Sequence, residues 1–219
     1  MTNKKALTGL LKLCAGAAAL MLLSAMLLWP AARATATAAC ACCSEPGVWY
    51  ERTDRIDEYE TSEIDRLRFD AVAHTYMTDA GEDMLEGFSN PAEEYALALV
   101  KRQRRWTLNF KDKEGRTGTL SFTLPASIVD FAADINDGQQ SGGGGPLLYK
   151  EWRLSGPVTG TGVFKKGSTP QTKFRLVFQG RGNSCTSAEV FDNWKLQIFG
   201  PRASYQFYGK FKDPTPAKN

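Results

Sequence analysis

The fold is decided by residues 106–124, WTLNFKDKEGRTGTLSFTL. Trp106, Leu108 and Phe110 alternate with polar residues, and a period of two places one face of a β-strand against a core. The same alternation returns at the end of the stretch, after a turn at 113–116 whose glycine tolerates positive φ. The stretch is therefore expected to form an antiparallel hairpin.

Further strands of the same style follow this hairpin. Their common feature is an aromatic residue and a leucine two positions apart, which predicts one inward face. These pairs begin at Trp106, Trp152, Phe174 and Trp194. Their irregular spacing excludes a propeller or a solenoid. We expect a mainly β protein, an antiparallel meander that forms a barrel or a sandwich, with minor helix at 79–88 and a strand at 93–100.

The chain divides into four segments by composition. They are a signal peptide at residues 1–36, a cysteine-rich arm at 37–44, a single β-rich domain at 45–211 and a flexible tail at 212–219. Lys4 and Lys5 precede the apolar helix-forming stretch 13–29, and small residues around Ala34 suit cleavage. This pattern predicts a secreted or periplasmic protein. The alternative is an uncleaved N-terminal helix that anchors the protein, because the stretch reaches the lower limit of about 17 residues for a membrane span.

The charge distribution argues against a nucleic-acid partner. The chain has 27 Lys and Arg and 24 Asp and Glu, a formal net charge of +3. Four of the basic residues lie in segment 1–36, which has no acid, so the rest carries 23 basic and 24 acidic residues. A near-neutral mature chain lacks the field that attracts polyanions. The basic run 101–105 is interpreted as an exposed strand end or turn, and we expect membrane contact only through an uncleaved leader.

The cysteines give the most specific chemical prediction in the sequence. Cys40, Cys42, Cys43 and Cys185 remain after the leader, and in an exported protein they predict disulfide formation. We expect Cys185 to pair with one of the other three. The alternative is a copper, zinc or redox site at the Cys40/Cys42/Cys43 cluster, with His74 as a candidate further ligand, since soft thiolates select these metals.

His74 is the only histidine, so a serine or cysteine hydrolase, or an isomerase, would have to use it. The sequence has no Gly-x-Ser-x-Gly elbow and no glycine-rich phosphate loop. We therefore expect no catalytic residue and no cofactor. The leading hypothesis is a non-catalytic binding or structural module, whose partner is a small apolar ligand or a cell-envelope component. A thiol-based metal or redox protein is the first alternative, and a His74-dependent hydrolase or isomerase is the second.

Overall fold

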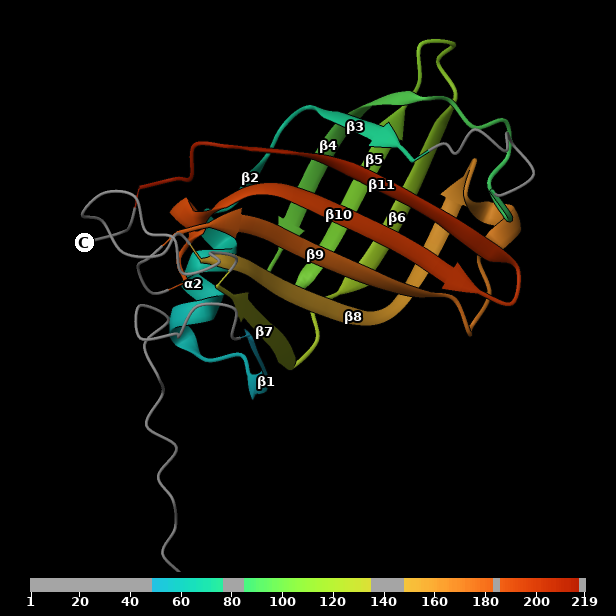
Figure 1. Cartoon of the computed structure of the whole chain (residues 1–219). Coiled ribbons are helices and arrows are strands. Elements are labelled where there is room, and N and C mark those ends of the chain that lie inside the picture. Colours follow the sequence, from blue (N-terminus) through green and yellow to red (C-terminus); the bar gives the residue numbers. More distant parts are fainter. Residues whose placement is uncertain (1–48, 77–84, 135–147, 183–185, 217–219) are drawn as a thin grey trace, which may run out of the picture. The chain divides into compact units, whose positions relative to one another are not determined.

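The computed structural model describes residues 49–76, 85–134, 148–182 and 186–216, all within the compact unit Ala39–Asn219. The described chain is mostly antiparallel strand (Figure 1). In chain order its elements are β1 (Trp49–Arg55), α2 (Glu58–Arg66), β2 (Arg68–Phe69), β3 (Val72–Thr75), β4 (Glu94–Arg102), β5 (Arg105–Lys111), β6 (Thr117–Thr123), β7 (Ser127–Ala133), β8 (Tyr149–Gly162), the 3-10 turn η3 (Lys165–Gly167), β9 (Lys173–Arg181), the 3-10 turn η4 (Ala188–Val190), β10 (Phe191–Gly200) and β11 (Ala203–Lys212).

The meander closes into an eight-stranded barrel, which confirms the expected β fold and decides for a barrel rather than a sandwich. The strand order is β8-β6-β5-β4-β3-β11-β10-β9, and β9 pairs back with β8. The long strand β8 permits closure because its two halves have different partners. The half from Tyr149 to Pro157 pairs with β9, and the half from Val158 to Gly162 pairs with β6. Strands β7 and β1 extend the sheet from the first half of β8.

The aromatic–x–leucine pairs point into the barrel, as the alternation predicts. Trp106, Trp152, Phe174 and Trp194 are each at most 2% exposed. In Figure 1 the strands β8 to β11 form the near wall and β4 to β6 the far wall, and these side chains fill the space between the walls. Burial of so many large rings is the main favourable term for the fold.

Glycines opposite the largest rings make room for them. Phe164 lies over Gly118 and Gly160. A Cβ added at Gly118 would lie 2.6 Å from the Phe164 ring, and a Cβ added at Gly160 would lie 2.9 Å from the Cβ of Phe164. Trp194 lies in the same way across its register partner Gly209, at 2.6 Å from the position of a Cβ. These three strand glycines therefore make room for aromatic rings.

Helix α2 covers one end of the barrel. Asp57 and Glu60 form a capping box at its N-terminus, each side chain accepting the other's backbone N–H. Ile64 and the following Leu67 are buried in the core, at 1% and 2% exposure. The sequence analysis missed this helix because most of its residues are charged or polar and only these two apolar positions mark its inner face.

Lys101 ties α2 to the barrel. Its Nζ donates to the backbone carbonyls of Ile64, Asp65 and Leu67 at 2.9, 3.1 and 2.9 Å, and lies 4.7 Å from the centre of the Trp106 ring. Burial lowers the pKa of Lys101 to about 8, although Asp65 opposes the shift. The β4–β5 hairpin confirms that the run 101–105 forms a strand end and turn. The prediction that the whole run is exposed is wrong for Lys101, whose ammonium makes partly buried hydrogen bonds.

The expected strand at 93–100 is confirmed as β4. The expected helix at 79–88 lies mostly outside the described residues, and its described end instead forms an isolated bridge between Glu86 and Ser204. The signal peptide and the cysteine-rich arm also lie outside them. Among the described helices, none has the length and apolar character needed to cross a membrane.

Candidate functional site

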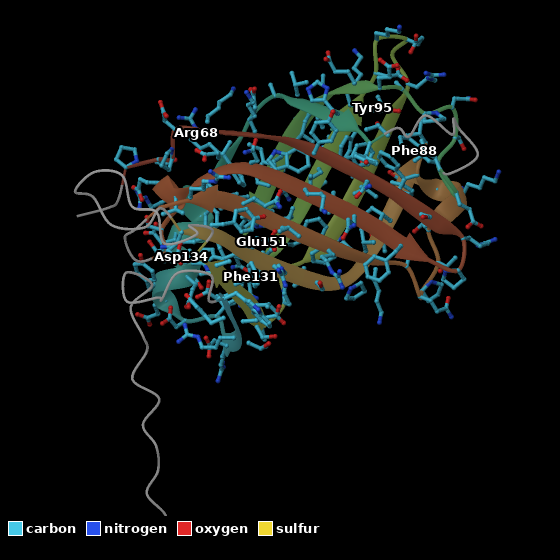
Figure 2. All side chains as sticks on the ribbon, viewed as in Figure 1. Arg68, Phe88, Tyr95, Phe131, Asp134 and Glu151 are labelled. Atoms are coloured by element: carbon cyan, nitrogen blue, oxygen red, sulfur yellow. The ribbon has the colours of Figure 1, made fainter. Side chains whose placement is uncertain are left out.

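The interior of the barrel is occupied by its own side chains. Ring centres lie 4.0 Å apart for Phe122 and Phe174 and 4.6 Å apart for Phe110 and Phe207, which is direct contact. At the end away from α2, Phe88 and Tyr95 continue this packing (Figure 2). Eight strands enclose a space that side chains alone can fill. An apolar ligand inside would have to displace these rings, so the described residues favour a site outside.

Three neighbouring depressions lie on the outer face of β8, β9, β10 and β11, with Tyr76, which follows β3, at one edge. Their volumes are about 360, 550 and 300 Å³. Tyr76 and Gln206 line the first and second, while Arg175 and Gln197 line the first and third. Lys195 lines the second and third. Because the depressions share walls, we treat them as one surface, the outer groove, defined by these five residues.

Strand register places the outward side chains of this surface in two rows. The first row crosses β8, β9, β10 and β11 at Ser155, Arg175, Gln197 and Gln206. The second crosses β8, β9, β10, β11 and β3 at Arg153, Val177, Lys195, Tyr208 and His74. Alternation along each strand sends the neighbouring residues into the core, so the barrel's packing fixes which side chains the groove presents.

A hydrogen-bond network around Glu151 borders the groove on the β8 side, where Glu151 lies beside Phe131 (Figure 2). Gln179 Nε2 donates to Glu151 Oε1 at 2.9 Å, and Tyr149 Oη donates to the same oxygen. Arg153 pairs with the other Glu151 oxygen. Burial and the bond to Glu151 raise the pKa of Tyr149 to about 12. Although burial opposes the change, these hydrogen bonds lower the pKa of Glu151, which stays ionised at neutral pH.

Two cations occupy the centre of the groove. Arg175 on β9 faces Gln197 on β10, so Lys195 is its diagonal neighbour, with Cβ atoms about 7–8 Å apart at most. The ion pairs formed within the described residues include neither side chain. The guanidinium carbon of Arg175 lies 6.0 Å from the Phe199 ring centre. The centre of the groove therefore carries a local positive charge.

Exposed aromatic rings flank these cations. Tyr76, Phe199 and Tyr208 are 51%, 40% and 46% exposed, and they make up half of the six large apolar side chains that are exposed in the described part of the chain. Tyr76 is held at the groove by its backbone N–H, which donates to the Gln206 carbonyl at 2.9 Å. Tyr76 and Phe199 line the first depression, and Tyr76 and Tyr208 line the second. A single exposed ring is ordinary, whereas three rings on one surface are typical of a contact surface.

His74 lies at the edge of the same face. Its ring stacks on Tyr208 with centres 5.3 Å apart, and its Nδ1 lies 3.8 Å from Glu94 Oε2. Neither neighbour is the serine or cysteine that a hydrolase of the expected kind needs. The hydrolase or isomerase hypothesis stays a prediction, to which these contacts add nothing.

A second polar cluster is buried where β7 meets β8. Lys150 is fully buried opposite Ala132, and its diagonal neighbours Asp130 and Asp134 are 8% and 4% exposed. Burial raises the pKa of Asp130, although Arg52 and Lys150 oppose the shift. Because Lys150 has no exposed surface, a substrate cannot reach it, and we do not assign this cluster to a binding site.

The cysteines predicted as a disulfide or metal site all lie outside the described residues. These are Cys40, Cys42, Cys43 and Cys185, so the disulfide, the copper or zinc site and the redox site stay predictions. Within the described residues, no group of three or more His, Cys, Asp and Glu side chains is placed to hold a metal ion.

No family model, curated protein or solved structure matches the chain. The function is therefore argued from the outer groove itself. The sequence alone did not identify Arg175, Lys195, Gln197 and Gln206 as site residues. The alternation of each strand does predict that their side chains point outward, but only the pairing of β9, β10 and β11 shows that they lie together.

Proposed function

We propose that the protein is an exported, non-catalytic binding module of the periplasm or cell exterior, and that its ligand binds in the outer groove. One observation carries the proposal: Tyr76, Phe199 and Tyr208 are exposed along two adjoining depressions of the outer groove, while the barrel interior is filled. Aromatic rings beside polar side chains are characteristic of recognition surfaces. The signal-like leader supports the exported location.

Two titratable groups at the β8 border of the groove, Tyr149 and Glu151, support binding without chemistry. General acid–base catalysis works best with a group whose pKa lies near the working pH. The pKa of Tyr149 is raised to about 12, and that of Glu151 is lowered. Both groups therefore keep one protonation state at neutral pH, as suits a fixed recognition surface.

The proposal is tested by NMR on the ¹⁵N-labelled protein recovered from an exporting host. Amide shifts are recorded against neutral and acidic oligosaccharides, a peptide mixture and lipid headgroups. We expect the shifted amides to cluster on β9, β10, β11 and β3. Tyr208→Ser is expected to weaken binding at least fivefold, whereas Val100→Ser, at an exposed apolar position on β4, leaves it unchanged. Shifts confined to β4, β5 and β6, or no shift with any compound, would contradict the proposal.

A further inference from the structure

We propose that the ligand of the outer groove is an acidic glycan, an oligosaccharide chain whose sugars carry carboxylates. This inference rests on the proposed function and adds the chemical class of the ligand. Three features of the groove carry it: exposed flat rings, a row of amide side chains and a pair of cations without a carboxylate partner among the described residues.

The rings suit the apolar face of a sugar. An aromatic face carries partial negative charge and attracts polarised C–H groups, which a pyranose presents from one side of its ring. Tyr208 is fixed by its stacking on His74, and Phe199 by the Arg175 guanidinium above it. Rings that are already held in place lose little conformational entropy when a ligand stacks on them.

The amide row suits sugar hydroxyls. Gln197 Nε2 donates to Gln206 Oε1 at 3.3 Å, and these residues are register partners on β10 and β11. An amide has two donor hydrogens and an acceptor oxygen, so this bond leaves both a donor group and an acceptor on the pair. Each sugar hydroxyl is itself both donor and acceptor, which a mixed pair of this kind satisfies better than a row of charges.

The cations select for carboxylates. Arg175 presents a planar fork that matches a carboxylate with two parallel hydrogen bonds, and Lys195 is near enough to reach the same or the next sugar. A nucleic acid would also be anionic, but it requires an extended basic surface. Here Arg153 pairs with two carboxylates, those of Glu51 and Glu151, at the β8 side of the groove, so the positive region is confined to Arg175 and Lys195.

The extent of the groove suits a chain rather than a single sugar. The lining residues span β9, β10, β11 and Tyr76, which follows β3 and lies beside β11, and neighbouring strands are about 4.8 Å apart. Three such steps cover about 14 Å, the length of a short oligosaccharide. Phe199 pairs with Ser204 and Tyr208 with Lys195, so the two rings are one strand apart but four residues apart along the strands. We therefore expect a ligand that runs obliquely over the strands, with its carboxylate over β9 and β10 and its ring faces over Phe199 and Tyr208.

The test is isothermal calorimetry on the exported protein, with tetragalacturonate as the acidic probe and its full methyl ester as the uncharged control. We expect the acid to bind and the ester to bind at least tenfold more weakly. Arg175→Gln and Lys195→Gln should each weaken binding of the acid about tenfold, the effect of one lost charged hydrogen bond. Lys113→Gln, at a side chain that is 87% exposed in the β5–β6 turn, should leave it unchanged.

Each other outcome overturns the inference in a distinguishable way. Equal binding of acid and ester would remove the role of the cations. Tighter binding of an oligothymidylate, with the same dependence on Arg175, would identify a nucleic acid ligand instead. If no glycan binds but another compound shifts the amides around Tyr208, the glycan is wrong and the proposed function survives. If nothing shifts those amides, both proposals fail.

Discussion

Lys101→Met removes the ammonium that joins α2 to the barrel while keeping an unbranched apolar side chain. In the folded protein, three carbonyls at the end of α2 accept from this one group, those of Ile64, Asp65 and Leu67. The bond to Asp65 is exposed, so water replaces it in the variant. The other two bonds are partly buried, and their carbonyls are left without a donor.

The structure gives the size of the effect. A buried polar group that loses its partner costs about 1–3 kcal/mol, so two carbonyls at about 1.5 kcal/mol each give about 3 kcal/mol. The ammonium also lies 4.7 Å from the Trp106 ring centre, and loss of this contact adds about 0.5–1 kcal/mol. We expect the free energy of unfolding to fall by 3 to 4 kcal/mol, about a third or more of the stability of a typical domain.

Urea unfolding followed by tryptophan fluorescence measures this loss. The matched control is Lys113→Met, because that lysine is 87% exposed and its replacement should change the stability by less than about 0.5 kcal/mol. A Lys101→Met variant within about 0.5 kcal/mol of the parent would refute the reasoning. It would mean that α2 is held by the burial of Ile64 and Leu67 alone.

The pH dependence supplies a second readout. Burial lowers the pKa of Lys101 in the folded protein to about 8, from the ordinary value of 10.5 that applies to the unfolded chain. Between these values the unfolded chain still binds the proton that the folded protein has released, so rising pH stabilises the folded state by up to about 1.4 kcal/mol per pH unit. The variant lacks this gain, so its deficit should widen between pH 7 and pH 9.5. A narrowing deficit would show that the carbonyls hold the ammonium more strongly than burial penalises it.

Three further predictions concern the core, the buried acid and the thiols. Gly160→Ala brings a Cβ within 2.9 Å of the Phe164 backbone and should cost about 1–3 kcal/mol in urea unfolding, whereas the exposed Thr161→Ala should cost less than about 0.5 kcal/mol. Burial raises the pKa of Asp130 in the folded state, so its contribution to stability is present below about pH 4 and is lost as pH rises above that value. Asp130→Asn should therefore flatten the profile of stability against pH above pH 4, and an unchanged profile would contradict the shift. Cys185 should resist alkylation until the protein is reduced, and peptide mapping without reduction should link it to one of the N-terminal cysteines. A free Cys185 thiol would contradict the predicted disulfide.

The sequence predicted the features that depend on local periodicity, namely the strands and the side chains that point inward. The alternation around Trp106 and Phe174 identifies these inward side chains without knowledge of the neighbouring strands, because the period of two is a property of a single strand. Barrel closure depends on β8, which changes partner after Pro157. The inward positions continue in step from Leu154 to Val158 across Gly156 and Pro157, so the alternation alone does not show that the partner changes. A sandwich and a barrel therefore had the same signature.

The groove was less predictable than the fold for a related reason. Outward residues such as Gln197 and Lys195 follow no apolar pattern, since solvent-facing positions are weakly constrained by packing. Their meaning comes from register across β9, β10 and β11, which a single strand does not encode. Lys101 is the opposite case, because a lysine in a basic run looks exposed until its three carbonyl acceptors are known.

The packing of the barrel also explains why we propose a binding site on its outside. Gly118 and Gly160 lie against Phe164, and Gly209 against Trp194, so the interior wall is fitted to specific rings. Removing one such ring to admit a ligand would cost about 3–5 kcal/mol, comparable to much of the stability of a domain. A substitution at an exposed position on the outside lowers the free energy of unfolding by only about a tenth of this amount. The outer groove is thus the part of this barrel whose chemistry can be adapted to a ligand while the fold is kept.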